Sequence, residues 1–133
     1  MIITEIVPVT KQKYRIVTDE QLAFVLYKGE LRLYGVVLGQ EITKDNYEKI
    51  VTEVLQKRAK LRAMNLLVKK DYTENGIRRK LAEGYYNSAQ IDATVDYLKK
   101  YGYIDDERYI RNYVAIHIQT KPRREIVRKL IGK

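Results

Sequence analysis

The stretch KRAKLRAMNLLVKKDYTENGIRRKL, from Lys57 to Leu81, returns loosely 49 residues later as DERYIRNYVAIHIQTKPRREIVRKL, from Asp106 to Leu130. Five of the 25 aligned positions are identical. They include an Ile and a Leu four residues apart with basic residues between them, the spacing of one helix face. A repeat of this length is typical of stacked helical units, which more often form binding surfaces than catalytic pockets.

The chain before the repeat has a different pattern. Runs rich in β-branched residues at 2–9, 14–18 and 22–27, separated by turn residues, predict three short strands in a small antiparallel meander. Residues 31–37 fit either a helical turn or a strand. From Thr43 the apolar residues recur at helical spacing, with Thr43 or Asp45 as the cap. One long helix, or two collinear ones, is expected to reach about residue 70.

Helix start and stop signals divide the rest of the chain into repeat units. Ser88 is expected to cap one helix, Gly102 to end it, and Pro122 to lie in the first turn of the last helix. The expected helices are 58–70, 73–83 and 88–101 in the first unit, and 105–119 and 122–131 in the second.

We therefore predict a mainly α fold of tandem three-helix repeats, the second incomplete, preceded by the β meander. The expected parts are an N-terminal β-rich extension (1–42), a long helix plus first three-helix repeat (43–104), and an incomplete second repeat (105–133).

Charge is distributed unevenly along the chain. The net charge is +9, of which residues 57–133 carry +10 and residues 1–56 carry −1. This bias favours a polyanion or an acidic protein surface as partner, although a solvated helix face explains any single charge equally well. The candidate contact residues are the basic groups of the repeats: Arg58, Arg62, Arg78, Arg79, Lys80, Arg108, Arg111, Arg123, Arg124, Arg128 and Lys129.

Other polar motifs favour structural roles. In Asp105-Asp106-Glu107 a helix cap with acidic residues in the first turn is preferred to a carboxylate dyad or metal site, because adjacent helical side chains diverge. His117 is the only histidine and there is no cysteine, so a zinc site is not expected. Without a phosphate-binding loop or nucleophile motif, we predict no catalytic residues, no metal and no cofactor, hence not an enzyme.

Tyrosine is the dominant aromatic residue, with 12 copies in the chain. Tyr85, Tyr86 and four others surround the junction between the units, where base stacking is possible and core packing between repeats is preferred. The other four are Tyr101, Tyr103, Tyr109 and Tyr113. With no signal-peptide pattern and no apolar run of membrane length, we expect a cytoplasmic protein without a membrane segment.

Several motifs together resemble the RecX family, the regulators of the bacterial recombinase RecA. Tyr72-Thr73-Glu74 with Ile77–Leu81 looks like the family helix S/T-x-x-E-L-x-x-K-L, and residues 97–109 are similar to its hallmark L-x-x-x-G-Y-L/I-N/D-D-x-R-Y/F. Residues 124–133 resemble the following I-x-x-x-L-x-x-K-G helix. Residues 27–31 and 39–42 are similar to the β-rich extension of Firmicute-type members.

The resemblance implies a non-enzymatic regulator that binds the RecA–single-stranded-DNA filament and inhibits or remodels it, in DNA repair, recombination and the SOS response. It also implies single- or double-stranded DNA as a partner; a stand-alone helical DNA-binding module is the alternative. Because members usually carry three full repeats, the chain is expected to be a truncated or short member. We further expect a homodimer through the incomplete unit, whose apolar side comprises Ile110, Val114, Ile126 and Leu130.

Overall fold

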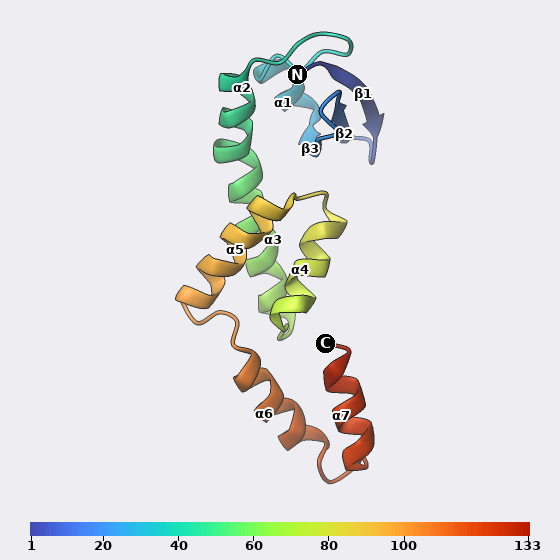
Figure 1. The fold of residues 1–133 in the computed structure, drawn as a ribbon, viewed down its shortest axis with the longest axis vertical. Helices are drawn as coiled ribbons and strands as arrows, with labels where there is room; N and C mark the ends of the chain where they lie inside the picture. The colour runs from blue at the N-terminus through green and yellow to red at the C-terminus, as the bar shows by residue number, and fades with distance from the viewer.

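A computed structural model describes residues 1–133 and shows an elongated molecule (Figure 1). A small sheet with two helices occupies one end, three helices pack together in the middle, and a helical hairpin extends to the other end. The predicted mainly α fold with an N-terminal antiparallel meander is confirmed. The division at residues 42 and 104 remains a prediction.

The sheet contains β1 (Ile3–Pro8), β2 (Lys13–Thr18) and β3 (Ala23–Tyr27) in the order β1-β2-β3. Ile16 of β2 lies opposite Phe24 of β3, and both are buried. Of the ambiguous segment 31–37, residues 31–33 belong to α1 (Lys28–Leu33), which follows β3 without a loop, and the rest is neither helix nor strand. Its start is stabilised because the Tyr27 N–H donates to the Glu30 carboxylate at 2.8 Å.

A continuous helical stretch connects the sheet to the first three-helix unit. It comprises α2 (Lys44–Lys49), the π-helical segment η1 (Ile50–Leu55) and α3 (Gln56–Lys69). Thr43 caps it by accepting a hydrogen bond from the Asn46 N–H at 3.1 Å. Residues of η1 belong to the core under the sheet, whereas Ala59, Ala63 and Leu66 belong to a second core. Two cores are therefore arranged along one helical axis.

The second core holds α3, α4 (Glu74–Glu83) and α5 (Ser88–Lys100) together. Ile77 and Leu81 of α4 are fully buried, as the repeat predicted. The prediction that Ser88 caps α5 is wrong, because Asn87 is the cap and Ser88 is the first helical residue. The Gln90 N–H donates to Asn87 Oδ1 at 2.8 Å, and the Asn87 N–H donates back to Gln90 Oε1 at 3.0 Å. This reciprocal pair satisfies two backbone donors, whereas a cap at Ser88 would have Ile91 three residues later, which has no side-chain acceptor.

The remaining helices form a hairpin of α6 (Asp106–His117) and α7 (Arg123–Ile131). The cap predicted at Asp105 is confirmed, since its carboxylate accepts from the Arg108 N–H at 3.1 Å. Pro122 lies at the cap position of α7 and not in its first turn. Helices α4 and α7 begin 49 residues apart, which matches the sequence repeat.

The apolar side expected for the hairpin is only partly covered. Ile126 is buried, Val114 and Leu130 are half-buried, and Ile110 is 47% exposed. The end of α7 returns to α4, where the Arg79 guanidinium donates to the Gly132 carbonyl at 3.1 Å. Pairing with a second copy of the chain remains a prediction.

Candidate functional site

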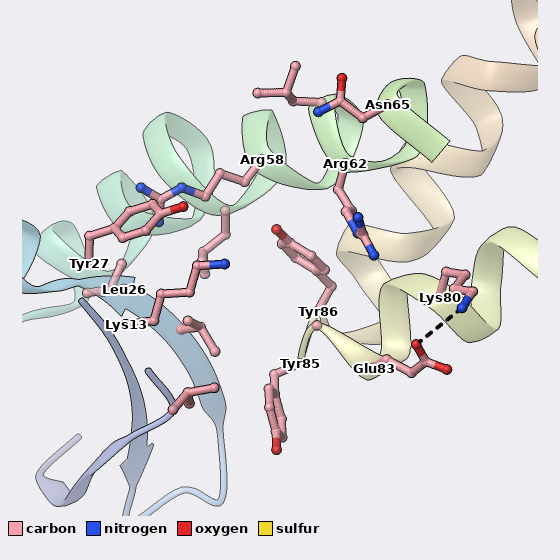
Figure 2. A pocket seen from close by; sticks show the side chains of 15 residues that line it. Lys13, Leu26, Tyr27, Arg58, Arg62, Asn65, Lys80, Glu83, Tyr85 and Tyr86 are labelled. Carbon is pink, nitrogen blue, oxygen red and sulfur yellow. Dashed lines mark ion pairs between the residues drawn. The ribbon is translucent and has the colours of Figure 1, made fainter. Parts of the chain in front are cut away.

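A hollow between the sheet and the first three-helix unit has a volume of about 690 Å³. Figure 2 shows α3 along one side, the sheet on the second, and α4 with the loop that follows it on the third. We call it the basic cleft. Its lining residues are Val9, Lys13, Val25, Leu26, Tyr27, Leu55, Arg58, Leu61, Arg62, Asn65, Lys80, Glu83, Gly84, Tyr85 and Tyr86.

Four cations and one carboxylate line the basic cleft. Arg58 is already engaged, because its Nη2 lies 2.7 Å from Glu30 Oε2 and its guanidinium lies 4.1 Å from the Tyr27 ring centre. Lys80 makes only a long ion pair of 3.8 Å with Glu83. Lys13 and Arg62 have no ion pair in the structure and are exposed. The cleft therefore keeps an excess of positive charge that can attract an anion.

Two of the tyrosines in the cleft are held by the turn after α4. Tyr86 is half-buried, and removal from water raises the pKa of its hydroxyl, with the positive charge of Arg58 acting in the opposite direction. A Cβ on Gly84 would lie 2.9 Å from the Tyr86 ring, so this close approach requires glycine. Tyr85 has a backbone φ of 66°, a conformation that residues other than glycine seldom adopt.

The Tyr85 ring also connects the two sides of the cleft. The Arg15 guanidinium of β2 lies 5.3 Å from its centre, within the range of a cation–π contact. Tyr85 is nonetheless 41% exposed. The cleft thus presents an aromatic ring and free cations together (Figure 2).

Some predicted contact residues have structural partners instead. Arg78 lies 3.0 Å from Glu74 and 2.7 Å from Asp92, so it connects α4 to α5. The hydrogen bond from Lys99, and then that from Arg78, hold the pKa of the Glu74 carboxyl below its usual range. Arg108 of α6 donates to the Gly102 carbonyl at 3.2 Å.

Five predicted residues lie on the helical hairpin, away from the basic cleft. All five are exposed and none has an ion pair or a side-chain hydrogen bond in the structure. We call them the hairpin cations: Arg111, Arg123, Arg124, Arg128 and Lys129. The structure therefore separates the predicted set into the cleft residues Arg58, Arg62 and Lys80, the paired residues Arg78, Arg79 and Arg108, and the hairpin cations.

Two tyrosines at the junction between the repeat units are more exposed to solvent than the sequence predicted. Tyr101 and Tyr103 are 57% and 42% exposed, so the prediction that they pack in a core between the units is wrong. Their rings lie 6.4 Å apart and contact each other and Tyr97, while Ile104 is the residue buried at this connection. His117 packs against Tyr113, with 4.3 Å between the ring centres.

Sequence reasoning missed the contribution of the sheet to the cleft. Three of the residues at the cleft belong to residues 1–56, whose net charge is slightly negative: Lys13, Arg15 and Tyr27. Counting net charge by region therefore did not identify them. The Tyr85-Tyr86 pair, already considered for base stacking, was the available signal.

The comparisons with known proteins agree with this architecture. Residues 59–98 match the family model described as RecX, first three-helix domain. Regulatory protein RecX from Caldanaerobacter subterraneus subsp. tengcongensis is 32% identical over 135 residues, which span 100% of this chain and 68% of that protein. The chain belongs to the RecX family.

Two further RecX proteins extend the comparison. Regulatory protein RecX from Clostridium acetobutylicum is 30% identical over 123 residues, which cover 92% of this chain and 58% of that protein. A crystal structure of regulatory protein RecX superposes with a TM-score of 0.59 at 26% identity, covering 98% of this chain and 66% of that one. The chain thus spans about two thirds or less of the length of these RecX proteins.

The structure also contains information on membrane-spanning helices and on possible metal sites. None of the helices combines the length and the apolar character that a bilayer crossing requires. Nowhere do three or more His, Cys, Asp or Glu side chains come together in a group that could hold a metal ion.

Proposed function

We propose that this chain is a non-enzymatic regulator of the RecA recombinase. In this proposal it binds the RecA–single-stranded-DNA filament in the cytoplasm and inhibits or remodels it. Membership of the RecX family supports the proposal, because the relatives are named regulatory proteins. The structural observation that carries it is the set of hairpin cations, which are exposed and without acidic partners.

Unpaired surface cations favour binding to a polyanion for a physical reason. Each Lys or Arg that contacts a phosphate releases condensed counterions, so affinity increases with the number of such contacts. A cation that already has a carboxylate partner gains less from the same contact. The five hairpin cations and the two free cations of the basic cleft are therefore the best-placed groups for a nucleoprotein filament.

The decisive experiment is a RecA filament assay. RecA is assembled on single-stranded DNA, the purified chain is added, and ATP hydrolysis and filament disassembly are followed. We expect both to change when the chain is added. The Caldanaerobacter RecX, of which this chain covers 68%, is the positive control. No effect at several-fold molar excess, where that control is active, would contradict the proposal.

Binding to DNA alone is the second candidate function. The observation that favours it is the packing of α3, α4 and α5 into a three-helix unit with exposed basic side chains on α3. Binding to duplex DNA without RecA, with an affinity that decreases steeply with salt, would support it. A chain that binds duplex DNA tightly and leaves RecA filaments unchanged would favour this function over the first.

A further inference from the structure

We infer that the basic cleft binds a short segment of single-stranded nucleic acid, with a base stacked on Tyr85 and phosphates held by Lys13 and Arg62. The inference deepens the proposed function and rests on it, since it names a place on this chain that holds a DNA strand. The cleft volume, the charge of its lining and the conformation of Tyr85 carry the argument.

The backbone of Tyr85 is the first observation. At φ of 66° it has the left-handed conformation, which costs an ordinary residue free energy that glycine does not lose. A Gly at this position would complete the end of α4 at a lower cost. The tyrosine ring is half-exposed beside the cleft, so its burial compensates for little of this cost. A strained residue whose side chain is displayed at a cleft points to a role in binding.

The surroundings of the ring are the second observation. The Arg15 guanidinium, 5.3 Å from the ring centre, restrains the ring against β2. Tyr85 as a residue nonetheless remains 41% exposed, so it can be reached from solvent. An aromatic ring already held in place loses little conformational freedom when a base stacks on it. Tyr27, 39% exposed, lies on the opposite wall with Lys13 at 5.6 Å from its centre.

The charges of the lining are the third observation. Lys13 projects from the sheet and Arg62 projects from α3 toward the space that Tyr86 also enters (Figure 2). Neither cation has an ion pair in the structure, whereas Arg58 is neutralised by Glu30. Free cations placed on either side of aromatic rings are the arrangement that holds the phosphates and bases of a single strand.

The size and composition of the cleft decide between possible occupants. A volume of about 690 Å³ lies within the range of roughly 300–1,000 Å³ that small-ligand sites occupy. An acidic peptide would use the cations but would leave the tyrosine faces without a planar partner. A double helix keeps its bases stacked on one another, so its bases offer no free face to the tyrosine rings. A single strand uses both the cations and the rings.

The test measures the binding of a fluorescein-labelled oligothymidylate of about 10 nucleotides by fluorescence anisotropy, since single-strand sites commonly span ~4–16 nucleotides. Tyr85→Gly is the key variant because it removes the ring and also relieves the left-handed strain. We expect its affinity for the oligonucleotide to fall roughly tenfold while its melting temperature stays the same or increases. Loss of binding therefore cannot be attributed to loss of folding.

A matched pair of lysines tests the phosphate contact. Lys13→Gln removes a cation from the basic cleft, and Lys11→Gln removes the same charge from the same hairpin outside it. We expect Lys13→Gln to reduce the slope of log affinity against log salt by about 0.7, the value for one phosphate contact on a single strand. Lys11→Gln should leave the slope unchanged.

Three outcomes would overturn the inference. The first is unchanged oligonucleotide binding in either Tyr85→Gly or Lys13→Gln. The second is an equal effect of Lys11→Gln and Lys13→Gln. The third is equally tight binding of an oligoglutamate of about ten residues with the same dependence on Tyr85, which would assign the cleft to an acidic peptide.

The result also separates this inference from the proposed function. RecA regulation that persists alongside any of the three outcomes removes the inference and leaves the function. Cleft-dependent oligonucleotide binding in a chain that does not affect RecA filaments removes the function and leaves the inference.

Discussion

Tyr85 at the end of α4 occupies the same backbone position as Gly102 at the end of α5. Both follow the residue that caps the helix, and both have positive φ, 66° and 72°. In each case the next residue donates its N–H back into the helix, from Tyr86 to the Leu81 carbonyl at 3.4 Å and from Tyr103 to the Leu98 carbonyl at 2.8 Å. The same helix ending is thus formed once with glycine and once with a strained tyrosine.

Gly102→Ala should decrease the free energy of unfolding by about 1 kcal/mol, because the left-handed conformation is less favourable for alanine than for glycine. An added Cβ meets nothing within 4 Å, so the effect comes from the backbone and not from a clash. Urea denaturation measures it. Gly29→Ala in α1 is the control, since Gly29 also has open space and no positive φ. That control should be neutral or stabilising by up to about 1 kcal/mol, and an equal loss in both variants would contradict the explanation.

Arg58→Ala should destabilise the contact between α3 and the sheet. Arg58 donates to Glu30 at 2.7 Å and lies over the Tyr27 ring, and the side chains of the ion pair are only 27% and 20% exposed. We expect a loss of about 1–2 kcal/mol in the free energy of unfolding. Arg32→Ala, an exposed arginine of α1 with no partner, is the matched control. If both variants unfold at the same urea concentration, Arg58 does not stabilise this contact.

The helices and strands could be predicted from local sequence patterns, whereas the basic cleft could not. Ile77, Leu81 and their repeat counterparts Ile126 and Leu130 sit at helical spacing, which is a property of neighbouring residues. The failure at Ser88 was also local: Asn87 and Ser88 are both good caps, and the choice depends on the return hydrogen bond from Gln90.

The basic cleft depends on contacts between distant parts of the chain. Lys13, Arg58 and Lys80 come from three separate regions, and no sequence spacing brings them together. Arg78 and Arg79 look equivalent in sequence, yet Asp92 of the next helix pairs with Arg78 alone. Tertiary packing therefore decides which cations are free, and this information is missing from a charge count.

The stability contributed by Glu74 should depend on pH. Lys99 and Arg78 hold the pKa of this carboxyl below the ordinary value of about 4.3. A carboxyl whose pKa is lower in the folded state stabilises the fold fully above that ordinary value and loses this contribution as the pH falls through the folded-state pKa. Glu74→Gln should therefore cost about 0.5–1 kcal/mol at pH 7, a modest value because the ion pairs are partly exposed, and progressively less as the pH falls below that ordinary value.

Urea denaturation of the parent and of Glu74→Gln across pH 2–7 tests this dependence. Glu83→Gln is the control on the same helix, because Glu83 is exposed and its ion pair with Lys80 is long. A difference between parent and Glu74→Gln that stays constant over the whole range would show that the charge of Glu74 does not contribute to stability.

Reversing charge on the helical hairpin should weaken the regulation of RecA proposed above. Arg124→Glu with Arg128→Glu changes two of the hairpin cations, which are exposed and unpaired, so folding should be little affected. We expect the concentration of chain needed for half-maximal filament disassembly to increase at least about tenfold, since two attractive phosphate contacts become repulsive. Lys44→Glu with Lys49→Glu makes the same change of charge on α2, at exposed lysines far from the hairpin. Equal weakening by both pairs would mean that only net charge matters, and the hairpin would lose its special role. Weakening by the hairpin pair alone would locate the contact on α7.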